Sequence, residues 1–444
     1  MAWYTQTDAT TDSHVILMEP VMYKAAMEGR IEEVMLELNK DKLDIIVSPY
    51  KNTVLHITAL FGKTECLKNI LAKCPLIYDP LNSRGETPLH IAAREGHNDI
   101  VQLLIDHANR NNYVGASVPM LMQTNEDKDT VLHEAVRNCH TALVALFNKE
   151  APELSQLSNN AEETPLYLAA EKGLDCIVCQ ILQCRLVPNI APGYGGPYGR
   201  NALHAAVLRD SQDCADRLLD WKQDLLREPD ICGWTPLHYA ARYGYVPMVK
   251  KLLVKDKFVA YLAAENDDKK TALHVATMQG HLEVMRLLIS ECPGCWEMLN
   301  SRGQNILHIA VKSGREAVMK FILRHSWLSS LINQKDNEGN TPLHLLVTSK
   351  CYMPEFIMHP KVEKNAFNKE NLTALDVLAY AVPSGLTTAV GGPIERALTR
   401  GGAIMGRRNL SGADKDDPDE AIVGKDGKER DKITEKQCYR ITGK

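Results

Sequence analysis

The chain contains 444 residues, of which 45% are hydrophobic and only 6% are aromatic. This composition favours cores of small aliphatic side chains, and the length exceeds that of one ordinary domain. The formal net charge of −5 argues against nucleic-acid binding, which relies on a basic surface. Because the sequence has no run of about 18 apolar residues and no N-terminal signal pattern, we expect neither a membrane-spanning helix nor secretion.

One short phrase recurs along the chain, and its positions occupied mostly by His are 32 to 37 residues apart, with one step of 43. In chain order the copies are TVLHITALFG from Thr53, TPLHIAAREG from Thr87, TVLHEAVRNC from Thr130, TPLYLAAEKG from Thr164, NALHAAVLRD from Asn201, TPLHYAARYG from Thr235, TALHVATMQG from Thr271, NILHIAVKSG from Asn305 and TPLHLLVTSK from Thr341. Degenerate copies begin at Pro20 and Thr373. A T-P-L-H-x-A phrase repeated about every 33 residues resembles the ankyrin repeat. The resemblance predicts an all-α fold, an ankyrin-repeat solenoid of helix-turn-helix units with projecting turns, followed by a disordered tail.

The residues of each phrase explain the predicted unit. Thr or Asn caps the first helix, and Pro fits the next position because it needs no hydrogen-bond donor there. A Gly such as Gly96 ends this helix, and a second helix follows with an apolar stripe, as at Ile100, Val101, Leu104 and Ile105. A single unit cannot bury its own stripe, so we expect stability to come from neighbouring units and the terminal copies to act as caps.

The pattern predicts three segments. Residues 1–17 are expected to be a flexible N-terminal tail, residues 18–382 an array of about ten or eleven units, and residues 383–444 a charged flexible linker or tail. Within the tail we predict one short helix near residues 394–399. Arg396, Arg400, Arg407 and Arg408 either touch an anionic lipid surface or remain solvated.

Two longer connections interrupt the array, at residues 109–129 and at residues 187–199. Loops on repeat arrays often carry binding residues, so each is a candidate binding loop, with a mere spacer as the alternative.

The recurring His residues raise the question of metal binding or catalysis. Successive copies lie about one repeat apart, which is too far for two imidazoles to share a zinc ion. We therefore expect these His side chains to hydrogen-bond one unit to the next. Cys176 with Cys179, and Cys292 with Cys295, have the spacing of redox dithiols or half zinc sites, but nothing nearby completes a site, so we interpret them as structural. No known catalytic motif occurs, and we predict no enzyme activity, no cofactor and no metal.

The order of variant phrases, including MEPVMYKAAMEG, TVLHEAVRN, TPLYLAAEKG, GRNALHAAV, GWTPLHYAARYG, CPGCWEMLNSRGQNILHIAV and INQKDNEGNTPLHLLV, resembles the plant Accelerated-Cell-Death-Six-like family of ankyrin-repeat membrane proteins. The resemblance covers residues 18 to 380. It implies a role in salicylic-acid-dependent defence, growth control and cell death, and a multi-helix membrane domain with a Pro-Gly-Gly motif after the repeats. The present sequence ends with CYRITGK where those apolar helices are expected, so a truncated product, an isoform or a member without the anchor are the alternatives.

These features favour a non-enzymatic protein-interaction scaffold, a cytoplasmic regulator of plant defence that binds protein partners through a concave face of helices and fingers. The alternative is the cytosolic half of a membrane-anchored transport or channel-like immune regulator, peripheral at the plasma membrane or joined to full-length relatives. We predict no nucleic-acid or small-molecule partner. The candidate binding residues follow the phrase His by one, four or five positions, together with one aromatic residue expected at an exposed finger tip, and are Ile91, Arg94, Glu95, Arg137, Glu171, Lys172, Trp234, Tyr239, Arg242, Tyr243, Met278 and Lys312.

Overall fold

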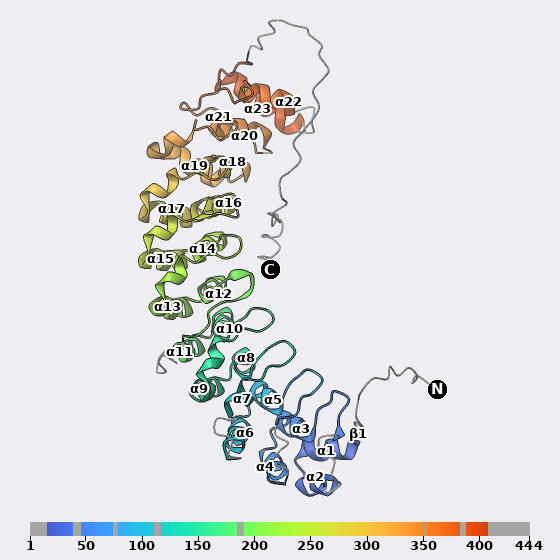
Figure 1. The fold of residues 1–444 in the computed structure, drawn as a ribbon. Helices are drawn as coiled ribbons and strands as arrows, with labels where there is room; N and C mark the ends of the chain where they lie inside the picture. The colour runs from blue at the N-terminus through green and yellow to red at the C-terminus, as the bar shows by residue number, and fades with distance from the viewer. Residues whose placement is uncertain are drawn as a thin grey trace, which may run out of the picture. The chain divides into compact units, whose positions relative to one another are not determined.

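The computed structural model describes residues 16–38, 46–73, 79–110, 117–183, 191–349, 351–381 and 388–406 (Figure 1). By its contacts the chain divides into two compact units, unit 1 ending at Leu225 and unit 2 beginning at Leu226. Each unit is a stack of helix pairs, with the first helix of every pair in one row and the second helix in another. The predicted all-α architecture of ankyrin type is confirmed.

The described residues of unit 1 form six helix pairs, each starting at or just after a recurring phrase. The first helices are α1 (Pro20–Glu28), α3 (Val54–Leu60), α5 (Pro88–Glu95), α8 (Val131–Arg137), α10 (Pro165–Lys172) and α12 (Ala202–Leu208). The second helices are α2 (Ile31–Leu38), α4 (Thr64–Lys73), α6 (Asn98–Arg110), α9 (Thr141–Glu150), α11 (Asp175–Gln183) and α13 (Gln212–Trp221). Short elements complete the unit: parallel strands β1 (Ile16–Leu17) and β2 (Ile46–Val47), α7 (Ser117–Leu121), and the 3-10 turns η1 (Pro152–Gln156) and η3 (Pro197–Gly199).

Unit 2 repeats the arrangement. Its first helices are α14 (Pro236–Tyr243), α16 (Ala272–Gln279), α18 (Ile306–Lys312), α20 (Pro342–Thr348) and α22 (Ala374–Ala381), and its second helices are α15 (Val246–Lys255), α17 (Leu282–Glu291), α19 (Glu316–Arg324), α21 (Pro354–Ile357) and α23 (Thr388–Arg400). The connections include η5 (Lys257–Tyr261), η6 (Pro293–Glu297), η7 (Ser326–Leu331) and the antiparallel strands β3 (Ala263–Ala264) and β4 (Lys270–Thr271). The turn η4 (Gln223–Leu226) lies at the boundary of the two units.

A Thr–His pair shapes the start of most first helices. At α5, Thr87 is the N-cap, and its backbone N–H donates to Nδ1 of His90 at 3.3 Å. The Thr87 hydroxyl lies 2.8 Å from the same nitrogen and accepts from the His90 N–H at 3.3 Å. This reciprocal box satisfies donors that the first turn leaves without partners. At the other end of α5, Gly96 has φ +80°, the left-handed conformation that glycine adopts at low cost.

The other nitrogen of the same imidazoles reaches the next finger. A finger is the turn that projects between two successive helix pairs. His90 Nε2 lies 3.2 Å from the carbonyl oxygen of Asp129, 39 residues further along the chain. The same bond, at 2.9 to 3.1 Å, joins His56 to Glu86, His133 to Glu163, His238 to Lys270, His308 to Asn340 and His344 to Leu372. The expected hydrogen bond from one repeat to the next is therefore confirmed at these six positions.

The apolar stripes of the second helices form the core between neighbouring pairs. On α6, Ile100, Val101, Leu104 and Ile105 are buried as the sequence predicts, and α6 contacts both α4 and α5. Small residues of the first helices, such as Ala92 and Ala93 of α5, are also buried, which lets adjacent first helices approach closely.

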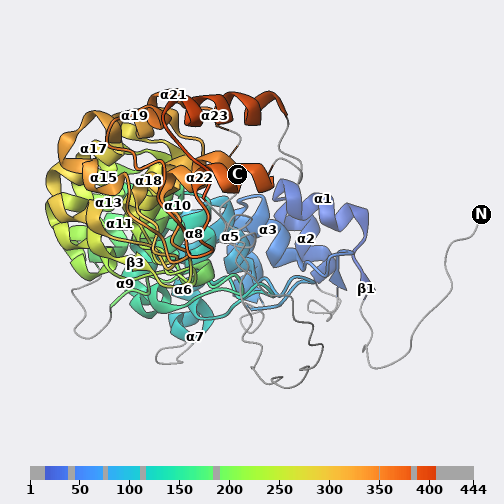
Figure 2. The ribbon, with the colours of Figure 1, turned by 90° about the horizontal axis from the view of Figure 1, so that it is seen from above.

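The folded part of unit 2 extends beyond the predicted boundary at residue 383. The short helix predicted near residues 394–399 is part of the longer helix α23, which contacts α21 and α22 (Figure 2). Ile394 and Leu398 on α23 are completely buried. The helix therefore begins before the predicted segment and continues across Pro393, stabilised by these tertiary contacts. Arg396 and Arg400 are exposed on this helix, whereas Arg407, Arg408, the N-terminal residues 1–15 and the rest of the charged tail lie outside the described residues.

The buried imidazoles make the stability of the array dependent on pH. Burial lowers the pKa of His56, His90 and His274 to about 4, although the carbonyl hydrogen bonds of His56 and His90 oppose the effect. In the unfolded chain these groups titrate near pH 6.5, so between about 6.5 and 4 the unfolded chain binds more protons. Each His then lowers the free energy of unfolding by about 1.4 kcal/mol for every unit of pH decrease.

We expect the thermal unfolding midpoint to be nearly constant between about pH 7 and 8 and to fall steeply below about pH 6.5. Burial raises the pKa of Asp79 to about 6, which acts in the opposite sense, but one carboxyl does not offset three imidazoles. Circular dichroism melts over this range measure the effect. A midpoint that does not change between about pH 6.5 and 4.5 would contradict the burial of neutral imidazoles.

Packing within unit 2 gives a second prediction. Leu237 of α14 is completely buried, so Leu237→Ala leaves a cavity and is expected to lower the free energy of unfolding by about 2–5 kcal/mol. Urea denaturation measures the loss. The exposed Lys250 on α15 provides a control, since Lys250→Ala is expected to change stability by less than about 0.5 kcal/mol.

Candidate functional site

The last turns of the first helices carry the side chains that the core does not use. We call this surface the first-helix face and define it by the residues four and five positions after the phrase His, together with the finger loops beside them. Arg94, Arg137, Arg242, Tyr243 and Met278 are half-buried there. Glu95, Glu171, Lys172 and Lys312 are exposed there. All nine are candidate binding residues from the sequence.

The structure corrects the three remaining candidates, because Ile91, Trp234 and Tyr239 are buried. Their exposed fractions are 2%, 3% and 1%. Ile91 and Tyr239 follow the phrase His by one position, and that position packs inside the array. Trp234 was expected at an exposed finger tip, but its indole Nε1 donates to the Asp267 carboxylate at 3.0 Å, and its ring centroid lies 5.1 Å from that of Tyr239. Trp234 and Tyr239 thus pack together beneath the finger, and Ile91 is part of the core of unit 1.

The guanidinium group of Arg242 stacks on Trp234, one ring of this buried pair, and on the neighbouring Tyr243. Its guanidinium carbon lies 5.6 Å from the centroid of the Trp234 ring and 5.9 Å from that of Tyr243. Stacking of this kind favours a cation over an aromatic face. Arg242 therefore combines a structural contact with partial exposure at the surface.

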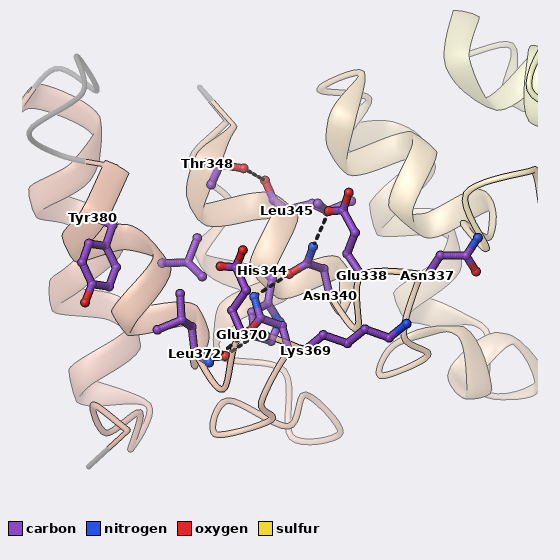
Figure 3. Close-up of a pocket in the computed structure, with 12 residues that line it drawn as sticks. Asn337, Glu338, Asn340, His344, Leu345, Thr348, Lys369, Glu370, Leu372 and Tyr380 are labelled. Atoms are coloured by element: carbon purple, nitrogen blue, oxygen red, sulfur yellow. Dashed lines mark hydrogen bonds between the residues drawn. The ribbon is translucent and has the colours of Figure 1, made fainter. Parts of the chain in front are cut away.

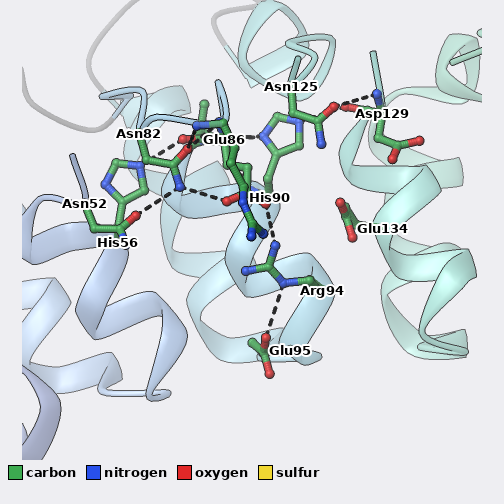
Figure 4. A network of polar contacts seen from close by, with 12 residues as sticks. Asn52, His56, Asn82, Glu86, His90, Arg94, Glu95, Asn125, Asp129 and Glu134 are labelled. Atoms are coloured by element: carbon green, nitrogen blue, oxygen red, sulfur yellow. Dashed lines mark hydrogen bonds and ion pairs between the residues drawn. The ribbon is translucent and has the colours of Figure 1, made fainter. Parts of the chain in front are cut away.

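In unit 1 the fingers and first helices share a network of amides and charges (Figure 4). Asn82 Nδ2 donates to the Asn52 side-chain oxygen at 3.0 Å and to the Glu86 carboxylate at 2.8 Å. Arg94 of α5 donates to Glu86 and, at 3.3 Å, to Glu95. Burial alone would raise the pKa of Glu86, but Asn82 and Arg94 hold it below its ordinary value.

The next pair repeats this arrangement with different partners. Arg137 of α8 donates to both oxygens of Asp129, at 2.8 and 3.1 Å, and to Glu163 at 3.5 Å. Asn159 Nδ2 donates to Asp129 at 2.8 Å and to Glu163 at 3.0 Å. Each guanidinium is thus already shared between two carboxylates.

The phrase with Tyr in place of His is compensated by its own finger. The Tyr167 ring is 1% exposed, and its hydroxyl hydrogen-bonds the Arg200 side chain. Burial raises the Tyr167 pKa to about 12. A Cβ atom at Gly196 would overlap the Tyr167 ring, so the Gly-rich stretch that includes residues 193–199 is a fitted cover for this tyrosine. The part of the longer connection at residues 191–199 therefore has a structural role, while residues 187–190 lie outside the described part of the chain.

In unit 2 the first-helix face is hollowed between α20 and α22. A cavity of about 900 Å³ with a mixed polar and apolar lining lies there. It is lined by the fingers and by side chains of both helices, among them Asn340, His344, Leu345, Thr348, Lys369, Glu370 and Tyr380 (Figure 3). A neighbouring hollow of about 490 Å³ shares Leu345 and Thr348 and reaches Lys312 and Arg302. Asn368 Nδ2 donates to the Asn340 side-chain oxygen at 3.0 Å across the floor.

Several of these groove residues are absent from the sequence candidates. Thr348 and Ser349 follow His344 by four and five positions, and Tyr380 follows Asp376, the last copy of the same position, by four. The spacing rule that selected Arg94 or Lys312 therefore also finds them when it is extended to the last two phrases. The finger residues Lys369 and Glu370 carry no comparable signal.

The pair formed by Cys292 and Cys295 lacks the features of a reactive dithiol. Cys292 and Cys295 are buried free thiols, and burial raises the pKa of both, to about 12 at Cys295. Such thiols stay protonated near neutral pH, whereas a redox dithiol needs a thiolate. Across the described ranges, no three His, Cys, Asp or Glu side chains are grouped so as to hold a metal ion. None of the helices in those ranges has the length and apolar character needed to cross a bilayer.

Comparisons with known proteins agree with the helix-pair architecture. The family model described as "Ankyrin repeats (3 copies)" matches residues 22–115, 132–228, 178–261, 222–296, 254–330 and 293–368. Over 332 residues the chain is 28% identical to the human transient receptor potential cation channel subfamily A member 1, a match that covers 65% of this chain and 28% of the channel. Over 242 residues it is 27% identical to the Arabidopsis thaliana protein ACCELERATED CELL DEATH 6, covering 51% of this chain and 36% of that protein.

The curated relatives are longer than the matched region, since the chain spans about a third or less of their length. Among solved structures, the ankyrin repeat domain of Bcl-3 aligns with a TM-score of 0.43 and 26% identity, covering 51% of this chain and 94% of that domain.

The buried Tyr239 gives a test of its structural role. Its hydroxyl donates to the Asp230 carboxylate at 2.5 Å inside the first finger of unit 2. Tyr239→Phe removes a hydrogen bond to a charged group, so we expect the free energy of unfolding to fall by about 1.5–3 kcal/mol. Urea denaturation measures this, and Tyr50→Phe, whose ring is 67% exposed, is the control expected to change little. Equal stability of Tyr239→Phe and the parent chain would show that the contact contributes nothing.

Proposed function

The chain belongs to the ankyrin-repeat family, and from that premise we propose that it is a non-enzymatic scaffold that binds other proteins across its first-helix face. The observation that carries the proposal is the separation of roles along each first helix. Its apolar residues and its His are used for stacking, whereas the residues of the last turn, such as Glu95, Lys172 and Lys312, remain exposed. A row of exposed, chemically varied side chains on a rigid stack is suited to recognition.

The proposed binding residues are those of the sequence candidates that reach the surface. They are Arg94, Glu95, Arg137, Glu171, Lys172, Arg242, Tyr243, Met278 and Lys312, and we add Thr348 and Tyr380 from the groove of unit 2. Half-buried arginine and tyrosine side chains are the types that contribute most to protein interfaces.

We further propose a regulatory role in plant defence and cell-death signalling. The proposal is supported by the ordered series of variant phrases and by the 27% identity to the Arabidopsis protein ACCELERATED CELL DEATH 6. Cytoplasmic residence is part of the same proposal, with the partner a protein of that signalling process.

A second candidate is a channel-like or transport regulator of which this chain represents the cytosolic part. It is favoured by the match to the transient receptor potential channel over 65% of the chain. Fractionation of plant tissue distinguishes the two candidates: the scaffold is expected in the cytosolic fraction, and the channel-like regulator in the plasma-membrane fraction together with full-length relatives.

A paired charge exchange tests the binding face without changing net charge. The double variant Glu95→Lys, Lys172→Glu alters two exposed first-helix positions, and we expect it to lose at least one partner captured from plant extract by the parent chain. The control Glu65→Lys, Lys68→Glu makes the same exchange on the second helix α4, where both side chains are more than 60% exposed. We expect the control to keep every partner, with capture measured by quantitative mass spectrometry. Identical partners for both variants would place binding elsewhere.

A further inference from the structure

Glu134 is a charge at a position that the repeat otherwise keeps apolar. It directly follows the phrase His of α8, and its exposed fraction is only 6%. In the other phrases between residues 53 and 349 the same position is occupied by Ile57, Ile91, Leu168, Ala205, Tyr239, Val275, Ile309 and Leu345. A buried carboxylate there costs stability unless a cation or hydrogen-bond donors satisfy it.

No such partner is present among the described residues. Within the described ranges the Glu134 carboxylate makes no hydrogen bond or ion pair, and Figure 4 draws it near Asp129 and Arg94 with no dashed line to either. Burial, and then the nearby Asp129, raise its pKa, while Arg94 and Arg137 act in the opposite direction without restoring the ordinary value. The carboxylate therefore lacks a cation of its own.

The arginines nearby are already committed. Arg94 binds Glu86 and Glu95, and Arg137 binds Asp129 and Glu163. With Glu134, this cluster holds five carboxylates and two guanidinium groups, a net charge of −3, which the nearby Arg84 reduces to −2. We call it the acidic cluster.

We propose that the acidic cluster is the docking site for a basic segment of a partner protein, with an arginine or lysine side chain of the partner placed against Glu134 between α5 and α8. This deepens the proposed scaffold function and rests on it. A guanidinium presents several donors in one plane and completes a buried carboxylate better than water does at such a site. The surrounding negative charge attracts a basic segment and disfavours an acidic one.

Peptide binding to the full chain tests the proposal. The probes are two fluorescein-labelled peptides of equal length, one with arginine alternating with glycine and serine, the other with glutamate in place of arginine. In fluorescence anisotropy titrations we expect the arginine probe to bind at least about tenfold more tightly than the glutamate probe. Glu134→Gln is expected to weaken binding of the arginine probe by about tenfold or more, and Glu65→Gln on α4, with the same charge change, to leave it unaltered.

Thermal unfolding separates this role from a structural one. A carboxylate retained for binding is expected to destabilise the free chain, so Glu134→Gln and Glu134→Leu should both raise the unfolding midpoint while weakening the arginine probe. A lowered midpoint would show that Glu134 has a structural partner and would overturn the proposal, as would equal affinity of the parent chain and Glu134→Gln.

The outcomes also separate this proposal from the general one. If Glu134→Gln keeps every partner while the Glu95→Lys, Lys172→Glu chain loses one, the scaffold function stands and the acidic cluster is not its docking site. If neither variant loses a partner, the first-helix face itself is not the binding surface.

Discussion

The array depends on the hydrogen bonds by which a His side chain joins one repeat to the next. Through Nδ1 the imidazole completes the cap of its own helix, as His90 does with Thr87, and through Nε2 it reaches the carbonyl of Asp129 in the following finger. The same side chain therefore fixes the N-terminal cap of its own helix and the position of the next finger. At the six positions where Nε2 reaches the next finger, both nitrogens are used in this way, so these imidazoles are structural joints.

This joint divides each first helix into two functional parts. The residue after the His lies inside the array, where Ile91 and Tyr239 are buried, while the residues of the last turn lie at its surface. A polar group on the inner side lowers stability unless it has a partner, as the Tyr239 hydroxyl has in the Asp230 carboxylate. On the outer side, the residues four positions after the His, such as Arg94, Glu171 and Met278, differ in charge and length from one repeat to the next, which suits them to the recognition proposed for this face.

The sequence predicts what local residues determine and fails where distant ones decide. Helix starts at Thr or Asn and ends at Gly96 or Gly244 follow from caps and turns, and they are found as predicted. The burial of Trp234 depends on Asp267, 33 residues away, and no local pattern pairs the two. Helix α23 likewise depends on α21 and α22, whose contacts outweigh the interruption at Pro393.

Tyr167 and Glu134 depart from the repeat pattern, and their surroundings indicate whether each serves the fold or the proposed binding. Tyr167 departs from the His of other phrases, but Arg200 satisfies its hydroxyl and Gly196 leaves room for its ring, so the change is compensated within the fold. Glu134 departs from an apolar position, and no donor or cation of the described chain compensates it. A buried group that the fold leaves unsatisfied lowers the stability of the free chain, and a bound cationic side chain offsets that cost. We therefore attribute Glu134 to the binding of a partner and Tyr167 to the structure of the array.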